Sequence, residues 1–395
     1  MKKVLITASR IYTPHRSIEG GAVLIEGEKI VAVGEMEELS EEIKRNEVGQ
    51  AELELIEARE GIVAPGFIDL HIHGGGGADV MDCTPGALQN LTLFLARHGT
   101  TGFLPTILAA PPPEMLKAIE ANITALEQGT QGAQILGLNL EGPFLNPRQK
   151  GALRKEGLRL PDAGLLLELI TCGKGWVKIM TLAPELNGAL GLIELLTREG
   201  ITPAAGHTEA TYKEMEEAVR RGLKHITHTF NAMRALHHRE PGAAGAALTL
   251  DALSTELIAD GVHVHPAIMK LVLKAKGHEK VALISDAMRA AGLPEGAYGL
   301  GGQKVWVREG KAKLADGTLA GSTLTLDRAV KFMIQNIGLS PNEALYLATA
   351  APASIINVSP HKGQLVPGGD ADLLILDSNW DVKLTMVRGK IVYRS

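Results

Sequence analysis

The chain has 395 residues, 45% of them hydrophobic and 22% charged, with 2 cysteines and a formal net charge of −5. This length and composition predict a large globular core, organised as one barrel-sized domain and a smaller one. The acidic balance makes nucleic acid a poor partner, although a local basic site for a small anion is compatible with it.

The N-terminus predicts neither export nor membrane insertion. It reads "MKKVLITASR", with an apolar run too short for the core of a signal peptide. No apolar stretch in the chain approaches the ~18 residues of a membrane span. Cys83 and Cys172 have no close spacing, which argues against a disulfide framework and a thiolate metal site. We therefore expect a cytoplasmic protein with no membrane contact.

Both ends of the chain are predicted to form strands. The segment "AVLIEGEKIVAVGE" indicates a hairpin that turns at Gly27, and "LELIEAREGIVAPGF" adds a strand. The C-terminus continues this pattern in "DADLLILD" and "VKLTMVRGKIVYRS". Neither end has enough strands for a stable sheet alone. We expect residues 1–62 and 362–395 to form one small β-sandwich domain, which the chain leaves and re-enters.

Residues 63–361 alternate between short apolar runs and helical patterns. The eight runs are "FIDLHIH", "TGFLPTIL", "QILGLNL", "WVKIMTLA", "ITPAAG", "KHITHTF", "TELIADGVHV" and "KVALISD". Such alternation indicates a parallel sheet covered by helices. Eight units predict a closed (β/α)₈ TIM-type barrel as the catalytic domain, with a doubly wound open sheet as the alternative.

The helical patterns follow most of these runs, and several end on glycine, as a left-handed cap prefers. Helices are expected over residues 85–99, 113–129, 189–200, 212–222 and 265–277. After the eighth run, residues 298–322 indicate an inserted hairpin. Two further helical segments, residues 325–338 and 340–357, complete the barrel domain.

Ionisable residues stand at the C-terminal ends of the apolar runs. In chain order they are His71, His73, Glu141, His207, His228, Asp260, His263 and Asp286. In a barrel these ends share one face, where active sites are built. Residues more than two hundred positions apart are therefore expected to converge. Gly142 and Pro143 end the third run directly after Glu141 and turn the chain away from it.

Five of these residues predict a metal centre. His71 and His73 lie two apart on a strand and so project to the same side. Taken singly, each of the five has a structural explanation, such as a surface pair, a cap or a core histidine. Together, imidazole and carboxylate groups at strand ends favour a divalent metal, Zn²⁺ first, with Fe²⁺, Mn²⁺ or Co²⁺ as alternatives. His225 has the opposite strand parity to His228 and is expected to face the helices.

Asp286 is expected to act in proton transfer. A carboxylate beside a metal centre can accept a proton from attacking water and then protonate a leaving amine. The alternative role is that of a further metal ligand, and the two roles are compatible.

A second polar cluster follows the sixth run in "FNAMRALHHREPG". Asn231, His237, His238 and Arg239 supply hydrogen-bond donors there, and arginine suits bidentate recognition of phosphate or carboxylate. The alternative is a solvated loop with a structural pair between Arg239 and Glu240. Beside a metal centre, the cluster predicts an anionic substrate group.

These motifs resemble a known family. "DLHIHG", "LEGPF", "GHT", "THTFNAM", "HHREPG", "ADGVHVHP", "SDAM" and "DGTLAGS" occur in this order. The chain, from about residue 60 to its C-terminal "GGDADLLILD", is similar to the N-acetylglucosamine-6-phosphate deacetylase family of the amidohydrolase superfamily. "LEGPF" together with "FNAM" and "HHREPG" is far more specific than the histidine pair of the superfamily.

The resemblance implies roles for particular residues. Glu141, His207 and His228 would bind the main metal, and His71 and His73 would complete a second site that Glu141 bridges, giving one or two ions per subunit. Asp286 would be the catalytic acid and base. Arg239 would reach the phosphate from the neighbouring subunit, which implies a homodimer with shared sites. The implied substrate-binding residues are Asn231, Ala232, His238, Arg239, His263, Gly151, Ala152, Leu153, Leu319, Ala320 and Gly321.

The implied reaction is the hydrolysis of N-acetyl-D-glucosamine 6-phosphate to D-glucosamine 6-phosphate and acetate, in amino-sugar catabolism. Leu153 stands where relatives often carry a polar residue, which leaves room for the galactosamine isomer as substrate. Another amidohydrolase, acting on a linear or cyclic amide, is expected to lack the "FNAM…HHREPG" loop. A catalytically silent scaffold is expected to have lost metal ligands, and none is lost here.

Overall fold

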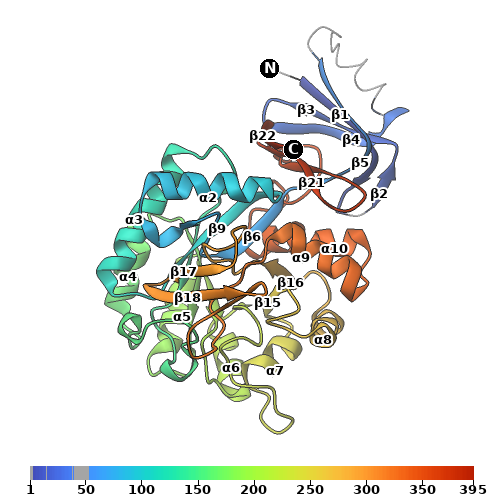
Figure 1. Ribbon diagram of the computed structural model, residues 1–395. Coiled ribbons are helices and arrows are strands. Elements are labelled where there is room, and N and C mark those ends of the chain that lie inside the picture. The colour runs from blue at the N-terminus through green and yellow to red at the C-terminus, as the bar shows by residue number, and fades with distance from the viewer. Residues whose placement is uncertain (1–2, 15, 38, 40–52) are drawn as a thin grey trace.

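The structure is a computed structural model, which describes residues 3–14, 16–37, 39 and 53–395. It contains a helix-covered barrel and a separate small sheet, and both ends of the described chain lie in that sheet (Figure 1). Among the described residues, no helix combines the length and apolar character needed to cross a bilayer.

The small sheet has eight strands in the order β22-β21-β20-β5-β1-β3-β4, with β2 paired to β1. Strand β5 joins the two chain ends, since it runs parallel to β1 and antiparallel to β20. The strands are β1 (Lys3–Tyr12), β2 (Ser17–Glu19), β3 (Gly21–Glu26), β4 (Lys29–Glu35), β5 (Leu53–Pro65), β20 (Leu373–Leu376), β21 (Val382–Val387) and β22 (Lys390–Arg394).

The core of the small sheet requires both chain ends. One buried cluster combines Ile6 and Ile25 from the N-terminal strands with Leu373 and Leu384 from the C-terminal strands. The backbone of Ile30 also bonds that of residues 368 and 369, just before β20. The sheet therefore folds around a shared interior that neither end could form alone.

The second sheet forms the barrel, and all eight predicted runs are strands in it. The parallel order is β6-β9-β11-β12-β13-β14-β15-β16, with the short β10 beside β9. The Asp286 N–H, just after β16, donates to the His71 carbonyl of β6 at 2.9 Å, which links last strand to first. A closed barrel is therefore confirmed over an open sheet. The strands are β6 (Phe67–Ile72), β9 (Thr100–Leu108), β10 (Gln134–Ile135), β11 (Leu138–Glu141), β12 (Val177–Leu182), β13 (Thr202–Ala205), β14 (His225–Ile226), β15 (Ser254–Ile258) and β16 (Val281–Ile284).

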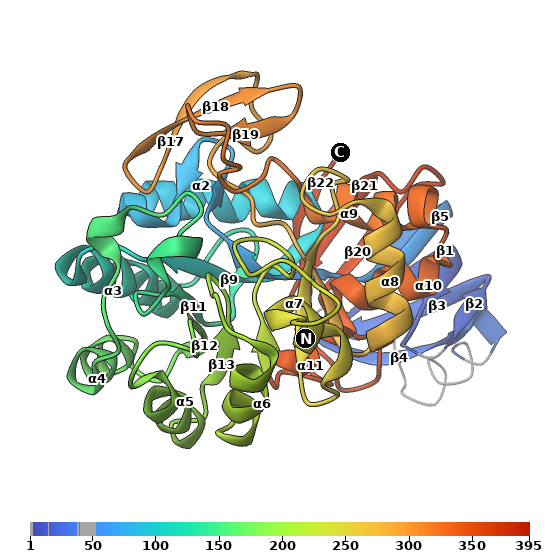
Figure 2. The same cartoon turned by 90° about the horizontal axis from the view of Figure 1, so that it is seen from below.

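Helices surround the barrel strands (Figures 1 and 2). The expected helices are present, and α4 and α7 are additional. Helix α7 has the sequence GAAGAALT, in which glycine and alanine give no apolar period. The helices are α2 (Pro85–Arg97), α3 (Pro112–Gln128), α4 (Ala163–Cys172), α5 (Ala189–Arg198), α6 (Tyr212–Arg220), α7 (Gly242–Thr249), α8 (Pro266–Lys276), α9 (Leu326–Phe332), α10 (Pro341–Ala348) and α11 (Ala350–Ile355).

The segment after β16 differs in detail from the expectation. In place of a simple hairpin it forms a three-stranded sheet of β17 (Gly296–Leu300), β18 (Gln303–Arg308) and β19 (Lys311–Lys313), which stands at the edge of the barrel (Figure 2). A π-helical turn, Met333–Ile337, follows α9. The expected helix over 340–357 breaks at Thr349, whose φ and ψ are −132° and −80°. A two-stranded ribbon, β7 (Gly74–Gly75) and β8 (Ala78–Asp79), follows β6.

Candidate metal centre and substrate cavity

Six ionisable side chains meet at the C-terminal ends of the barrel strands. They form two groups, within each of which the potential ligand atoms lie within 4.8 Å of one another. One group consists of His71, His73 and Asp286, and the other of Glu141, His207 and His228. All six are buried. The convergence that the barrel prediction required is therefore present in the structure.

Glu141 lies between the two groups. Its Oε1 is 3.0 Å from His207 Nε2, 3.1 Å from His228 Nε2 and 3.5 Å from His71 Nε2. Its Oε2 is 3.6 Å from His73 Nε2. One carboxylate thus faces all four imidazoles, which is the geometry required of a bridging ligand.

The donor atoms fit a metal better than they fit one another. His207 Nε2 and His228 Nε2 lie 3.1 Å apart, and two imidazole nitrogens this close cannot both carry a proton toward each other. His71 Nε2 is buried without a hydrogen-bond partner. Buried polar atoms normally have a partner. Convergent imidazole and carboxylate donors of this kind suit a divalent first-row ion.

The backbone is strained where it delivers these side chains. His207, His228 and Asp286 have φ values of 49°, 27° and 48°, in the left-handed region that non-glycine residues rarely adopt. Strain of this kind costs ~1–3 kcal/mol per residue and tends to cluster at functional sites. Each of the three lies two residues beyond the end of a short barrel strand, so the chain turns sharply as it leaves the barrel.

Backbone carbonyls orient two of the imidazoles. His73 Nδ1 faces the Thr106 carbonyl at 3.2 Å, and His207 Nδ1 faces the Gln149 carbonyl at 2.8 Å. A carbonyl can only accept, so Nδ1 carries a proton in both rings, and Nε2 has a lone pair to offer a metal whenever the ring is neutral. This outer contact is typical of histidines that bind metals.

The charges in the site are strongly coupled. Burial raises the pKa of Glu141, but the charge of His71 and the hydrogen bonds from His207 and His228 outweigh it and hold that pKa well below its ordinary value. Burial likewise raises the pKa of Asp286, yet the bond with His73 and the charge of His71 lower it overall. Both carboxylates are therefore available in the ionised form that binds cations.

Glu256 belongs to this site, although its sequence context did not identify it. It lies inside the apolar run of β15 and its side chain is fully buried. Its carboxylate is 3.1 Å from His71 Nδ1 and 3.2 Å from His225 Nε2. Burial raises its pKa, but His71 and His225 reverse that effect and lower it below the ordinary value.

The expectation for His225 is wrong. Its ring contacts Glu256 and, at 2.7 Å, Ser254 Oγ, so it points toward the network behind the metal ligands and not toward the helices. The parity argument failed because β14 contains only His225 and Ile226. His228 lies beyond the strand with a positive φ, so strand alternation does not relate the two residues.

Asp260 and His263 form a pair beside the metal ligands. His263 Nδ1 lies 2.7 Å from Asp260 Oδ2, and the same carboxyl accepts the backbone N–H of His263. Burial lowers the pKa of His263, but the bond with Asp260 outweighs burial and raises it overall. Asp260 therefore fixes the orientation of the His263 ring at the cavity wall.

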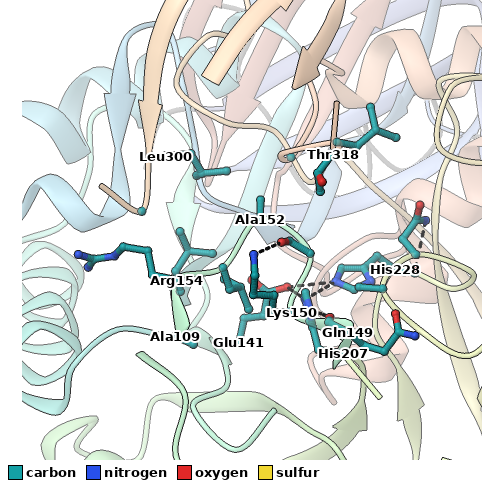
Figure 3. A pocket seen from close by; sticks show the side chains of 18 of the residues that line it. Ala109, Glu141, Gln149, Lys150, Ala152, Arg154, His207, His228, Leu300 and Thr318 are labelled. Atoms are coloured by element: carbon teal, nitrogen blue, oxygen red, sulfur yellow. Dashed lines mark hydrogen bonds and ion pairs between the residues drawn. The ribbon is translucent and has the colours of Figure 1, made fainter. Parts of the chain in front are cut away.

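A cavity of about 630 Å³ opens above the ligands. In Figure 3, Glu141, His207 and His228 lie on one side of it, and Leu300 of β17 and Thr318, in the loop after β19, lie on another. This volume suits a small-molecule substrate. The expected substrate residues that line it are Asn231, Ala232, His263, Gly151, Ala152, Leu153, Leu319 and Gly321.

Three expected substrate residues lie elsewhere in this single chain. Ala320 is fully buried and its N–H donates to the Ala312 carbonyl. His238 and Arg239 lie in an exposed loop, bonded to each other at 2.8 Å. None of the three residues is among those that line the cavity.

The segment after Glu141 supplies lining residues that sequence reasoning missed. Residues 148–155 line the cavity. In Figure 3, Arg154 extends away from the histidines, and Lys150 Nζ donates to the Gly151 carbonyl at 3.0 Å. The available signal was the basic run "RQKGALRKEG" so soon after a ligand. Leu153 lies within this segment and packs with Leu145 and Leu300, so it gives the cavity an apolar wall. The charged lining residues of the segment are Arg148, Lys150, Arg154 and Lys155.

Comparisons with known proteins agree with this architecture. Residues 62–392 match the amidohydrolase family, and residues 5–53 match the NagA composite domain. The chain is 41% identical to N-acetylglucosamine-6-phosphate deacetylase of Bacillus subtilis, over 85% of this chain and 86% of that protein. It is 40% identical to N-acetylgalactosamine-6-phosphate deacetylase of Escherichia coli O157:H7, over 84% and 87%.

Solved structures extend the likeness to the whole chain. A Mycobacterium smegmatis N-acetyl-D-glucosamine-6-phosphate deacetylase variant, in complex with N-acetyl-D-glucosamine 6-phosphate, is 33% identical with a TM-score of 0.90. That match covers 99% of this chain and 100% of the other. The chain therefore belongs to the amidohydrolase family, in the branch that contains the N-acetylhexosamine-6-phosphate deacetylases.

Proposed function

We propose that this amidohydrolase removes the acetyl group of N-acetyl-D-glucosamine 6-phosphate, giving D-glucosamine 6-phosphate and acetate in amino-sugar catabolism. The observation that carries the proposal is the convergence of two ligand groups on Glu141 beneath a cavity of about 630 Å³. Relatives that share the chain's full architecture carry this activity in their names.

Glu141, His207 and His228 would hold one divalent ion, and His71, His73 and Asp286 are placed to hold a second. Zn²⁺ is the first choice because the donors are imidazole and carboxylate groups and no redox chemistry is needed. When bound, the ion supplies Lewis acidity, which polarises a carbonyl oxygen and lowers the pKa of water.

Asp286 is assigned the proton transfers. Its carboxylate accepts a proton from the water that adds to the acetyl carbon. It then gives that proton to the sugar nitrogen as the C–N bond breaks, so acetate and a free amine leave. His263, held by Asp260, is placed at the cavity wall to bind a sugar hydroxyl.

The phosphate is assigned to basic groups at the mouth of the cavity. Arg148, Lys150, Arg154 and Lys155 supply positive charge within the chain. Arg239 is exposed and lies outside the cavity of its own chain, so we assign it to the cavity of a partner subunit in a homodimer. Free thiols at Cys83 and Cys172 favour a cytoplasmic location.

The galactosamine isomer is the second candidate substrate. Leu153 presents an apolar side chain to the cavity and offers no hydrogen bond to a sugar hydroxyl. A site that does not bind a hydroxyl discriminates weakly between epimers. The relative that acts on the galacto compound by name is as similar in sequence as the gluco enzyme.

Acetate release from the two 6-phosphates, measured side by side with metal analysis, tests this proposal. We expect stoichiometric metal, acetate release from the gluco compound, and loss of activity after chelation that added Zn²⁺ restores. Higher kcat/KM for the galacto compound would reassign the substrate. Purification without metal, together with no acetate from either compound, would instead indicate a silent scaffold.

A further inference from the structure

Glu256 contacts both ligand groups at once. Its Oε2 lies 3.1 Å from His71 Nδ1 and accepts the backbone N–H of His228 at 2.9 Å. Its Oε1 lies 3.2 Å from His225 Nε2. His71 and His228 belong to different ligand groups.

The contact with His71 determines which ring nitrogen is free. A carboxylate can only accept hydrogen bonds, so His71 Nδ1 carries a proton and directs it at Glu256. In the neutral ring, Nε2 is then left with its lone pair. This atom faces Asp286 and Glu141 and is the one without a hydrogen-bond partner. In its neutral form, His71 therefore offers Nε2 to a metal while Glu256 holds Nδ1.

The contact with His228 acts on the backbone. His228 has a φ of 27°, far from the values that residues other than glycine prefer. Its N–H is directed at a buried, charged acceptor, and hydrogen bonds to charged groups are stronger than those to neutral groups. Glu256 therefore helps to hold the strained turn that brings His228 to Glu141.

The partner of His71 Nδ1 is a carboxylate, whereas the Nδ1 partners of two other imidazoles are backbone carbonyls. His73 faces the Thr106 carbonyl and His207 the Gln149 carbonyl, both of which are neutral. A carboxylate partner makes an imidazole a stronger metal ligand than a carbonyl does, and outer contacts of this kind are typically worth about 10- to 100-fold in metal affinity or activity.

We propose that Glu256 is a positioning residue for the metal centre: it fixes the ring of His71 and the backbone of His228, and so sets the affinity of the ion that His71 binds. His225 completes the arrangement, since Ser254 and Glu256 hold its two nitrogens. This inference rests on the metal centre of the proposed function.

Metal affinities of Glu256→Gln, measured without substrate, test the inference. Gln keeps the shape and one acceptor oxygen but removes the charge, so we expect about 10- to 100-fold weaker binding of the ion at His71. A His73→Ala variant shows which measured affinity belongs to that ion. Asp327→Asn is the matched control, because Asp327 pairs with His98 Nδ1 at 3.0 Å far from the ligand set. It should bind metal as the wild type does.

Unchanged affinity for every ion in Glu256→Gln would overturn the inference, as would an equal loss in Asp327→Asn. Absence of metal binding by the wild-type chain would count against the proposed function instead. A second measurement is made on the unaltered chain, and a variant is used only to assign a signal. In zinc-loaded protein with ¹⁵N-labelled histidine, His71 must carry a proton on Nδ1, with its signal assigned by its loss in His71→Gln. A His71 ring without that proton would refute the inference.

Discussion

Asp286 occupies a position from which one side chain can serve both its own ligand group and the substrate. Its Oδ1 lies 3.1 Å from His73 Nε2 and 3.7 Å from His71 Nε2, and the residue also lines the cavity. Its low pKa means that it starts a reaction cycle without a proton. A group with these properties can accept a proton from water and is restored when it protonates the leaving amine.

Replacing Asp286 by Asn separates proton transfer from metal binding. Asn keeps an oxygen near His73 but cannot accept the proton. We expect kcat to fall by about 10²- to 10⁴-fold, with metal content close to that of the wild type. Turnover and metal content should be measured on the same samples. Near-normal turnover would remove Asp286 from the assigned role, and loss of metal would make it chiefly a ligand.

At the scale of secondary-structure elements, the site depends on the first and last barrel strands, β6 and β16, staying in register. Asp69, on β6, joins them: its Oδ1 accepts the N–H of His71 and the N–H of Ser285, each at 3.2 Å. Both donors are buried beside the ligands. Asp69 therefore closes the barrel at the position where His71 and Asp286 emerge.

Asp69→Leu should destabilise the barrel, because it leaves two buried N–H groups without this acceptor, at ~1–3 kcal/mol each. Asp69→Asn keeps the accepting oxygen and should cost less. Differential scanning calorimetry of the metal-free proteins measures both. Equal melting temperatures for Asp69→Leu and wild type would show that the barrel closes without this contact.

The same pair of variants has a pH signature. Burial raises the pKa of Asp69 to about 7. A carboxyl whose pKa is raised on folding binds more protons in the folded state, so its contribution to stability falls as pH rises from its unfolded pKa toward 7. Asn does not titrate. The stability of Asp69→Asn relative to wild type should therefore increase between pH 5 and pH 8.

The barrel elements could be predicted because their signal is local. Each core strand is buried on both faces and so appears as a continuous apolar run, and each ligand follows such a run. Glu256 lacked this signal because it lies inside an apolar run and not at its end. A single carboxylate at such a position does not indicate a site until its partners in the fold are known. The loop of residues 146–158 has no periodicity at all, so the position of Lys150 follows only from the fold.

At the scale of the whole molecule, one expectation cannot be read from a single chain. Arg239 is exposed, and its guanidinium bonds His238. The sequence motif indicates that Arg239 contacts the substrate. However, Arg239 is not among the residues that line the cavity of its own chain. Both observations agree if two chains associate so that each loop reaches the other's cavity, as closed two-fold assemblies permit.

Arg239→Ala should mainly raise KM for the phosphorylated sugar, and should change little for the unphosphorylated one. An equal effect on the two substrates would contradict phosphate recognition. Mixing then tests whether the contact crosses between subunits. In a hybrid of Arg239→Ala and Asp286→Asn chains, one cavity has an intact Asp286 and receives Arg239 from the partner.

Random re-association makes half of the dimers hybrids with one competent cavity each, so the mixture should recover about a quarter of wild-type activity at low substrate concentration. The control replaces the Asp286→Asn chain with one that carries both substitutions, which leaves no competent cavity. If Arg239 served its own chain, every cavity in either mixture would lack at least one of the two groups. The first mixture would then be no more active than the average of its parents, and the shared-site dimer would be excluded.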